Sequence, residues 1–568
     1  MAPSVWKLFR RDSKISIRRA RTEPSRSGTV YTTLPDSTKY IRLCRVIRTG
    51  DVNTGGEKIE VIFEIVPLVD SKGTYRALSY VWGDPNDCID ITVNGQRFPV
   101  TRNLEYWLRR IQALGYGDRI WIDQLSINQH DNSEKDQQVL LMGPVYQGAN
   151  EVLIGVCDQL DPKDHTSVRD WLEGMLIDLH LKDLDCFSVP SPPPSLSPTP
   201  DAMSKNPFLA LLRSLWFTRT WTVQEFCLAQ HSKLICPWGD VSWAVFVKAF
   251  MNWNKHRREC CEDVVDAHPG LMEECHRSLE HTRKYWKGQH ILQTMQLFMH
   301  LNVTNPRDKV YGLRALHRGS EDLPTPNYEQ PVPGVFIDFT LWAFRDVQSL
   351  FPLAYELHQE CSDTPSWAMN LSVPPDIDRN YWRRRLSGVG LHKASNGIPF
   401  VAELASPGCL RVQGIQVGHV EAVTDQLFSL PKCNFDLTNV LRSWYDFATD
   451  RRVDSLVLGR VDSLTMDAIH FDDWFCSTML GNQVEDRMAQ ESDLAKWRVA
   501  MSGLIKDPFA FVDFSAIVES HMTAVLGRRM FRTDTGYVGV SPASTKVGDT
   551  LWVLGGGNVR SMSNLRPR

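Results

Sequence analysis

The 568-residue sequence contains no uninterrupted apolar run of about eighteen or more residues, which is roughly what a helix needs to cross a bilayer. It also has no excess of basic residues, since 63 lysines and arginines stand against 67 aspartates and glutamates. A domain that binds nucleic acid usually carries such an excess. We therefore expect neither a membrane span nor a nucleic-acid partner.

Regularly paired cysteines are also absent. The 13 cysteines are odd in number and scattered, which fits free thiols in a reducing compartment better than a disulfide framework. The N-terminus has no apolar core of the kind that a secretory signal needs, but it is rich in arginine and serine. Such a start resembles a transit peptide, although Asp12 and Glu23 interrupt it and favour a basic disordered tail over residues 1–39. We expect a cytoplasmic protein.

Several motifs with a defined chemistry have no counterpart in the sequence. There is no Ser–His–Asp motif, kinase motif set or G-x-S-x-G elbow, and the glycines at 555–557 lack the lysine and hydroxyl residue of a phosphate loop. Cysteines and histidines do gather in one stretch, but without the regular C-x2-C pairs of zinc sites. The residues of that stretch are His256, Cys260, Cys261, His268, Cys275 and His276. The sequence therefore predicts no metal site and no required cofactor.

What the sequence does contain is a globular composition, with 42% hydrophobic residues and 18 tryptophans, and an alternation of strand and helix signals. Asn94-Gly95 between two alternating segments predicts a β-hairpin, and Gly115 is expected to end a helix over 104–114. Asn132 or Ser133 is expected to open a helix over 133–149. Strands are expected at 58–66, 75–82, 89–93, 97–100, 119–127, 152–156 and 234–238. This order predicts an α/β fold with three layers, in which helices cover both faces of a parallel sheet.

The character of the chain changes twice after this sheet. Residues 187–207 are rich in proline and serine and predict an extended insertion. Further on, the patterns predict an α+β region and a small β-rich C-terminal region. We therefore divide the chain into a tail (1–39), a domain with the insertion (40–285), a helical region (286–400) and a mixed C-terminal region with a β-rich end (401–568).

Six segments, in this order, resemble conserved blocks of one protein family. They are YRALSYVWGD at 75–84, IWIDQLSINQ at 120–129, the helix at 137–146, WFTRTW at 216–221 with Gln224-Glu225, DKVYGL at 308–313, and the C-terminal stretch 531–554. On these segments the chain is identified as a member of the heterokaryon incompatibility (HET) domain family of filamentous fungi, most closely over residues 40–230. Two positions depart from the family pattern: Ser126 stands in place of a cysteine, and Lys135 in place of an arginine whose planar fork could pair bidentately.

The resemblance implies a function in non-self recognition and programmed cell death after hyphal fusion, a form of fungal innate immunity that acts through protein partners or self-association. HET domains are regarded as similar in fold to TIR domains, some of which hydrolyse NAD. The resemblance therefore implies a TIR-like sheet and makes NAD a candidate substrate. Two interpretations stay open: an NAD glycohydrolase, and a non-catalytic self-associating signalling or adaptor module.

Three polar residues follow expected strands and are candidates for ligand binding. Asp84 comes directly after one strand, and Asn128 and Gln129 come after another. In open α/β sheets, ligands bind at the carboxyl ends of the strands, so these residues are expected along the rim of a crevice. The alternative for Asp84 and Asn128 is that they cap turns and helix starts.

Two carboxylates are candidates for chemistry, and a third is expected to be buried. Glu225 or Glu134 would stabilise the oxocarbenium-like state that forms when the nicotinamide–ribose bond breaks, while Asp84 and Asn128 orient the ribose. The alternative for Glu225 is a solvated residue or an ion pair with Arg219. Asp123 lies in an apolar segment and needs a partner, for which Arg219 and Arg76 are the candidates; a purely structural ion pair is the alternative. The tryptophans at 82, 121, 216 and 221 are expected in the core.

Overall fold

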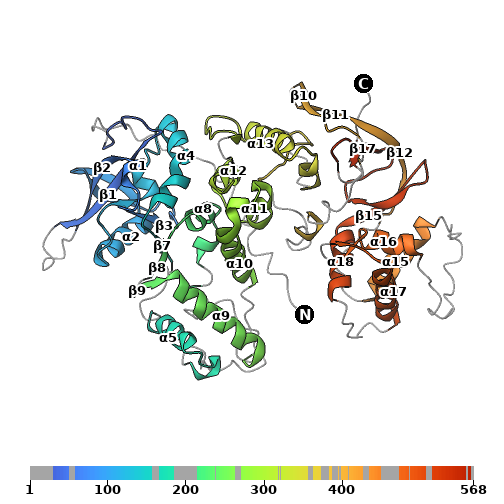
Figure 1. The fold of residues 1–568 in the computed structure, drawn as a ribbon, viewed down its shortest axis with the longest axis horizontal. Coiled ribbons are helices and arrows are strands. Elements are labelled where there is room, and N and C mark those ends of the chain that lie inside the picture. The colour runs from blue at the N-terminus through green and yellow to red at the C-terminus, as the bar shows by residue number, and fades with distance from the viewer. Residues whose placement is uncertain are drawn as a thin grey trace.

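A computed structural model describes most of the chain. The described residues are 30–49, 58–156, 165–184, 211, 214–236, 238–261, 270–317, 319, 322–355, 363–372, 383–386, 395, 398–406, 408–425, 434–449, 472–484, 487–506, 515–557 and 561–563. Most of the expected basic tail and the whole proline-rich insertion therefore lie outside the described residues. The sheet lies on the left of Figure 1, helices occupy the middle, and the C-terminal region lies on the right.

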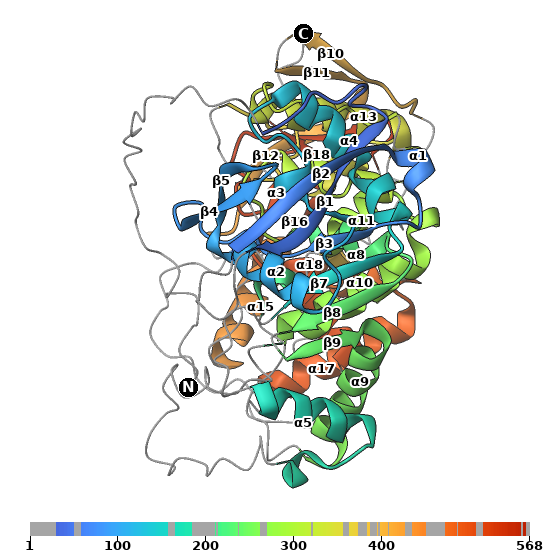
Figure 2. The same ribbon diagram turned by 90° about the vertical axis from the view of Figure 1, so that its left-hand side faces the viewer.

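The N-terminal part of the protein is built on one mixed β-sheet. Nine strands belong to it in the described part of the chain, in the spatial order β5-β4-β2-β1-β6-β3-β7-β8-β9, and Figure 2 shows them side by side. They are β1 (Tyr40–Thr49), β2 (Lys58–Pro67), β3 (Arg76–Ser79), β4 (Cys88–Val93), β5 (Gln96–Thr101), β6 (Ile120–Trp121), β7 (Glu151–Gly155), β8 (Ser232–Cys236) and β9 (Gly239–Ser242).

The α/β class is confirmed, but the sheet is not wholly parallel. Strands β6, β3, β7 and β8 run parallel, whereas the hairpins β4–β5 and β8–β9 and the pair β1–β2 run antiparallel. The short turns of the hairpins allow only antiparallel pairing.

Helices cover both faces of this sheet, as the sequence predicts. The residue alternation of a strand sends neighbouring side chains to opposite faces. Ala77 and Val152 pack in the cluster that contains Tyr146 from α4 (Asn132–Gly148), while Leu78 packs in the cluster that contains Trp107 from α2 (Arg102–Ala113). The result is three layers: helix, sheet and helix.

One glycine of β7 permits a close approach between the sheet and α2. A Cβ atom added to Gly155 would lie 2.7 Å from the Trp107 ring, which is itself fully buried. We expect Gly155→Ala to lower the free energy of unfolding by about 1–3 kcal/mol, because the ring has no free space into which it can shift. Thermal or denaturant unfolding measures the change. Gly239→Ala is the matched control, since a Cβ there meets nothing within 4 Å; an equal loss in both variants would contradict the packing argument.

The sequence predicts the turns correctly but one of the strands wrongly. Asn94 and Gly95 both have positive φ, 49° and 77°, which confirms the predicted hairpin turn, and Gly115 ends α2 with φ 74°. The strand expected over 119–127 is confirmed only at Ile120–Trp121 and is wrong beyond it. After β6 the chain forms the short helix α3 (Asp123–Ser126). The Ile122 amide donates to the Ser126 hydroxyl, and the Ser126 amide donates to the Ile122 carbonyl.

The start of α4 also differs from the prediction. Asp131, and neither Asn132 nor Ser133, is the N-cap residue, and its carboxylate accepts the Glu134 amide at 3.0 Å. An aspartate at this position also favours the positive end of the helix dipole.

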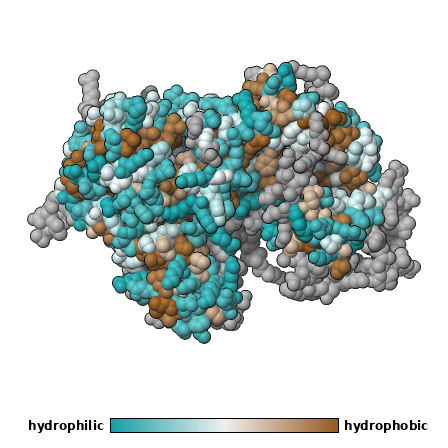
Figure 3. Space-filling model, in the orientation of Figure 1, coloured by the Kyte–Doolittle hydropathy of each residue, from teal (hydrophilic) through white to brown (hydrophobic). Residues whose placement is uncertain are grey.

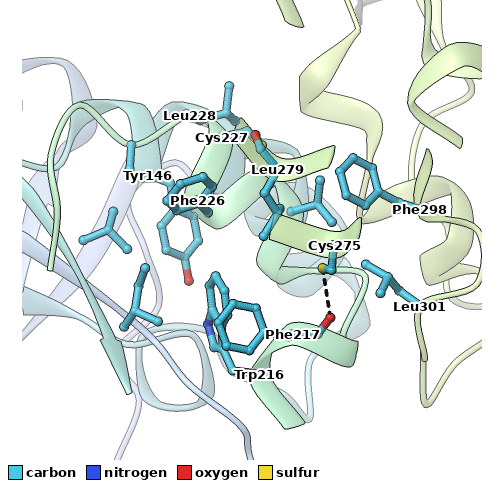
Figure 4. Packing of buried hydrophobic residues seen from close by; sticks show 14 of the residues in the cluster. Tyr146, Trp216, Phe217, Phe226, Cys227, Leu228, Cys275, Leu279, Phe298 and Leu301 are labelled. Carbon is cyan, nitrogen blue, oxygen red and sulfur yellow. Dashed lines mark hydrogen bonds between the residues drawn. The ribbon is translucent and has the colours of Figure 1, made fainter. Parts of the chain in front are cut away.

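The middle of the chain packs on the α4 face of the sheet. Its elements are α1 (Leu68–Ser71), α5 (His165–Leu176), η4 (Leu181–Asp183), η6 (Leu215–Thr218), α8 (Thr222–Cys227), α9 (Trp243–Glu259), α10 (Gly270–Tyr285), η8 (Trp286–Gly288), α11 (Ile291–Phe298), α12 (Asp308–Tyr311), η9 (Arg314–Leu316), α13 (Val332–Val347) and η11 (Phe351–Tyr355). One buried cluster runs from Ile41 to Leu386 through these elements. Figure 4 shows part of it around Trp216 and Phe217, where the Cys275 thiol donates to the Phe217 carbonyl. The expected helical region therefore shares its core with the sheet.

The tryptophans divide into two groups. Trp121 and Trp216 are fully buried, which confirms their prediction as core residues. Trp82 and Trp221 are only partly buried and lie beside the polar site described below. Residues 30–39, the described end of the expected tail, pack on the domain, with Tyr31 stacked on Phe63.

The C-terminal region has its own sheet and its own core. In the described residues a five-stranded sheet has the order β16-β15-β12-β17-β18, and a separate buried cluster centres on Trp444 and Trp497. The elements are β10 (Ala402–Ser406), β11 (Cys409–Val412), β12 (Gly414–Val423), α15 (Asn434–Ala448), α16 (Asp473–Met479), β13 (Gln483–Val484), β14 (Arg487–Met488), α17 (Glu491–Lys506), α18 (Ser515–Val525), β15 (Arg528–Thr533), β16 (Val538–Pro542), β17 (Thr550–Leu554) and β18 (Ser561–Ser563). The expected β-rich end is confirmed. Among the helices of the described residues, none is both long and apolar enough to cross a bilayer.

Candidate functional site

Charged side chains meet at the carboxyl ends of two parallel strands, β3 and β6. Ser79 is the last residue of β3, and Asp123 lies two positions after the last residue of β6. Helix α8 brings Glu225 to the same place, and Arg219 comes from the loop just before α8. This is the edge of the sheet where an α/β fold usually binds its ligand.

Glu225 is the most buried carboxyl group of this site, with 2% of its surface exposed. The Ser79 hydroxyl donates to its Oε2 atom, and the same hydroxyl oxygen accepts the Trp216 indole N–H at 2.7 Å. Burial raises the pKa of Glu225 to about 7, and the charge of Arg219 only partly opposes this rise. Near neutral pH the side chain is therefore divided between its acid and carboxylate forms.

Asp123 lies on the other side of the cluster and is 8% exposed. Its carboxylate accepts the Trp82 indole N–H at 2.6 Å and the Gln124 amide at 2.8 Å. Burial raises the pKa of Asp123, and the positive charge of Arg219 opposes the rise. Of the two arginines predicted as partners, Arg219 is the one whose charge acts on Asp123. Arg76, the other predicted partner, instead faces Glu151 at 3.7 Å, because β3 pairs with β7.

Arg219 joins these carboxyl groups to a third one. Its guanidinium donates to the Tyr80 carbonyl at the end of β3, which fixes it beside the sheet. From α12, Asp308 accepts the Tyr328 hydroxyl at 2.7 Å and a hydrogen bond from Trp221. Burial raises the pKa of Asp308, and Arg219 again acts in the opposite direction. The positive charge of Arg219 therefore lowers the pKa of three buried carboxyl groups, against the effect of burial.

Glu134, the second predicted catalytic carboxylate, belongs to a different arrangement. Both of its oxygens bind the guanidinium of Arg42, at 2.5 and 2.8 Å, and Oε1 also accepts the Asn128 amide at 2.9 Å. Arg42 and Glu134 are 1% and 8% exposed. The structure therefore places Glu134 in a bidentate ion pair with its oxygens occupied, and it does not bring Glu134 together with Glu225.

The predicted rim residues have unequal places. Gln129 donates to the Asp123 carbonyl at 3.1 Å and so contacts the charged cluster. The Asn128 side-chain oxygen accepts a hydrogen bond from the His130 amide. The carboxylate of Asp84, which is exposed, accepts hydrogen bonds from the backbone and side-chain nitrogens of Asn86. Both patterns are typical of turns. These contacts of Asp84 and Asn128 are the turn-capping alternative.

The sequence gives no role to several residues of the site. Ser79, Tyr80 and Trp82 all lie within the segment quoted for the family resemblance, and Asp308 opens another such segment. Their presence in these blocks was a usable signal. The Arg42–Glu134 pair had no such signal, because its partners lie in β1 and α4.

These observations define a mixed α/β domain with a buried acidic cluster at the carboxyl ends of its parallel strands. Residues 75–225 match the family model "HET: Heterokaryon incompatibility protein". Over this range, which begins just before β3 and ends at Glu225, the chain is similar to the HET family. Asp308 and Arg42 lie outside this range.

One curated relative is similar over part of the chain. It is heterokaryon incompatibility protein 6, OR allele, of Neurospora crassa, with 29% identity over 302 residues. The aligned part covers 44% of this chain and 44% of the relative, so the similarity spans less than half of either protein. No solved structure matches the chain.

Proposed function

We propose that this chain acts in heterokaryon incompatibility, as a cytoplasmic protein of non-self recognition that triggers cell death, and that it does so by cleaving the bond between nicotinamide and ribose in NAD. The matched HET domain and the incompatibility relative support the first part. The observation that carries the second part is Glu225. It is a buried carboxyl group with a pKa of about 7, held by Ser79 at the carboxyl ends of parallel strands.

The chemistry of this bond fits the residues of the cluster. Its cleavage passes through an oxocarbenium-like state, and a carboxylate beside the ribose stabilises the positive charge. Ionised Glu225 would supply that carboxylate, and the Trp216–Ser79 chain of hydrogen bonds holds it in one orientation. The TIR-like relationship is supported by the four parallel strands at the centre of the sheet.

Access to Glu225 requires a change in the site. The carboxyl group is 2% exposed, whereas Arg219, Trp82 and Trp221 are partly exposed. An arrangement in which the side chains around Glu225 move apart would open the way to it. We therefore expect activity only after a protein partner or self-association favours the open arrangement.

The same closed arrangement favours a second candidate, a non-catalytic signalling or adaptor module. In that case the cluster would hold the domain in one conformation, and recognition would change its docking surface. The two candidates differ in whether NAD is consumed.

The test is nicotinamide release from NAD by the purified full chain, alone and clustered by an antibody against a terminal tag. We expect release from the clustered protein, and a loss of about 100-fold or more in Glu225→Gln, which keeps the size of the side chain but removes its charge. Glu173→Gln, an exposed carboxylate on α5, is the matched control and should keep full activity. Unfolding curves establish that both variants are folded.

Absence of nicotinamide release from clustered wild-type protein would contradict the enzymatic proposal. Expression in fungal cells then separates the candidates. If Glu225→Gln stays toxic and cellular NAD stays constant, the adaptor is favoured. If toxicity and NAD loss disappear together, cleavage is favoured.

A further inference from the structure

We propose that His180, His256, Cys260 and Cys261 bind one Zn²⁺ ion. His180 directly precedes η4, and His256 lies in the last turn of α9. Cys260 is the C-cap residue of α9, and Cys261 follows it. One ligand atom from each of the four residues lies within 4.8 Å of all the others.

The distances between these atoms are those of a tetrahedral zinc site. Zinc bonds of about 2.3 Å to sulfur and about 2.0 Å to nitrogen place two sulfurs about 3.8 Å apart, and a sulfur and a nitrogen about 3.5 Å apart. The Cys260 and Cys261 sulfurs are 3.7 Å apart. Nδ1 of His180 lies 3.3 and 3.7 Å from the two sulfurs, and Nδ1 of His256 lies 3.1 Å from Cys260. A set of two sulfurs and two imidazole nitrogens is one that zinc prefers.

The surroundings of His256 also fit a ligand. Its Nε2 atom lies 3.0 Å from a carboxylate oxygen of Asp178, and a metal-bound histidine typically donates its other N–H to such a carboxylate. Asp178 is itself paired with Lys255 at 3.2 Å. Two thiolates and two neutral imidazoles balance the charge of Zn²⁺, and the Asp178–Lys255 pair is neutral too. His256 and Cys261 are 4% and 3% exposed, so half of the set is shielded from water.

Sequence spacing could not reveal this site. The regular cysteine pairs of many zinc sites are missing, and the fourth ligand, His180, comes from a segment far from the other three. Of the other residues of the cysteine- and histidine-rich stretch, Cys275 donates to the Phe217 carbonyl and His276 stacks on Trp243, and His268 lies outside the described residues.

A second group of histidines and an acid is less suited to a metal. His290, His317 and Asp346 also lie close together. However, Nδ1 of His290 accepts the Leu292 amide and Nε2 bonds to Asp346, so neither nitrogen has a lone pair for an ion.

The proposed zinc would join the loop after α5 to the end of α9. Helix α5 itself meets α9 through the Asn252 side chain, which donates to the Met175 carbonyl at 2.7 Å, and the loop after α5 meets it through the Asp178 contacts. Ile177 after α5 and Met251 in α9 are exposed hydrophobic residues, and Figure 3 shows hydrophobic patches on the lower lobe, where Figure 1 places α5 and α9. The ion would stabilise this lobe as a disulfide stabilises a small domain, and its loss would loosen the lobe.

The test is metal analysis of the full chain purified under reducing conditions without chelators, followed by titration with Zn²⁺ and Co²⁺. We expect about one zinc ion per chain. Co²⁺ should give the visible absorption of tetrahedral coordination together with thiolate charge-transfer bands. His180→Ala and Cys260→Ser should abolish both signals, and because both residues are exposed, these variants should fold. Cys88→Ser, an exposed thiol of the sheet, is the matched control and should bind as the wild type does.

Asp178→Asn gives a graded result. It keeps the four ligands and should weaken zinc binding by about 10- to 100-fold. Bound zinc should also protect Cys260 and Cys261 from alkylation until a chelator is added, and the chelator should lower the melting temperature. The proposal would be overturned by a full chain that binds no zinc with both thiols reduced, by octahedral cobalt spectra, or by a disulfide between Cys260 and Cys261 in freshly reduced protein. None of these outcomes depends on the NAD assay, because the site contains no residue of the Glu225 cluster.

Discussion

Glu134→Ala is expected to lower the free energy of unfolding by about 3–5 kcal/mol, measured by denaturant unfolding. The variant removes both carboxylate oxygens that bind the Arg42 guanidinium, and this side chain is only 1% exposed to water. It also leaves the Asn128 amide without its carboxylate partner. The loss is large because a charge stays buried without compensation, rather than because a surface ion pair is strong.

A double variant separates these two causes. Arg42→Met with Glu134→Leu removes the charge together with its partner, and we expect it to be considerably more stable than Glu134→Ala alone. Arg97→Ala, which breaks an exposed pair with Asp90, is the control and should change stability by less than about 1 kcal/mol. If the double variant is as unstable as the sum of its parts, the buried pair is itself the stabilising element, and the argument from uncompensated charge is wrong.

The same pair shows where the folded unit begins. Arg42 also donates to the Ser126 carbonyl at 3.2 Å and to the Thr32 carbonyl at 2.8 Å. It therefore connects the segment before β1, strand β1 and the start of α4. A fragment that begins at Tyr75, where the family match begins, would lack Arg42 and would leave Glu134 buried without its partner. We therefore expect a stable fragment with the matched range to need residues from about 30 onward.

Local features of the fold were predictable because local forces decide them. Asn94-Gly95 adopts positive φ angles that few other dipeptides tolerate, and the apolar spacing of α2 places Trp107 on the sheet. The apolar residues around Asp123 predict a strand for the same local reason. Instead the Ile122 amide donates to the Ser126 hydroxyl within a short helical turn, and no periodicity encodes this hydrogen bond.

The candidate site was predictable only in part, for a different physical reason. Asp84, Asn128 and Gln129 are predicted near the strand ends, because the topology of a parallel sheet brings such positions together, and of these Gln129 contacts the cluster. Asp123 and Arg219 are predicted as a pair because a buried carboxylate needs a partner. Asp308 and the four proposed zinc ligands depend on contacts between distant segments. Only the packing of α12 and α9 against the rest of the molecule brings these side chains into range.

Glu225 should also make the stability of the protein depend on pH. Its pKa is about 7 in the folded protein and 4.5 for the free group, so the folded state holds a proton that the unfolded state has already released. The stability that this proton contributes is fully present below about pH 4.5 and is lost as pH rises through 7. A difference of about 2.5 pKa units corresponds to about 3 kcal/mol.

Glu225→Gln should remove this dependence, because the amide does not titrate. We expect the variant to be more stable than the wild type at pH 8 by up to about 3 kcal/mol, and the difference to shrink toward pH 5. Urea unfolding at pH steps between 5 and 8 measures it, and Glu173→Gln should follow the wild-type curve. Parallel curves for Glu225→Gln and the wild type would show that the carboxyl group titrates normally in the folded protein. If Glu225→Gln is more stable but inactive, the ionised carboxylate is kept for its chemistry at the expense of stability. If the variant is more stable and fully functional, catalysis does not explain the buried charge.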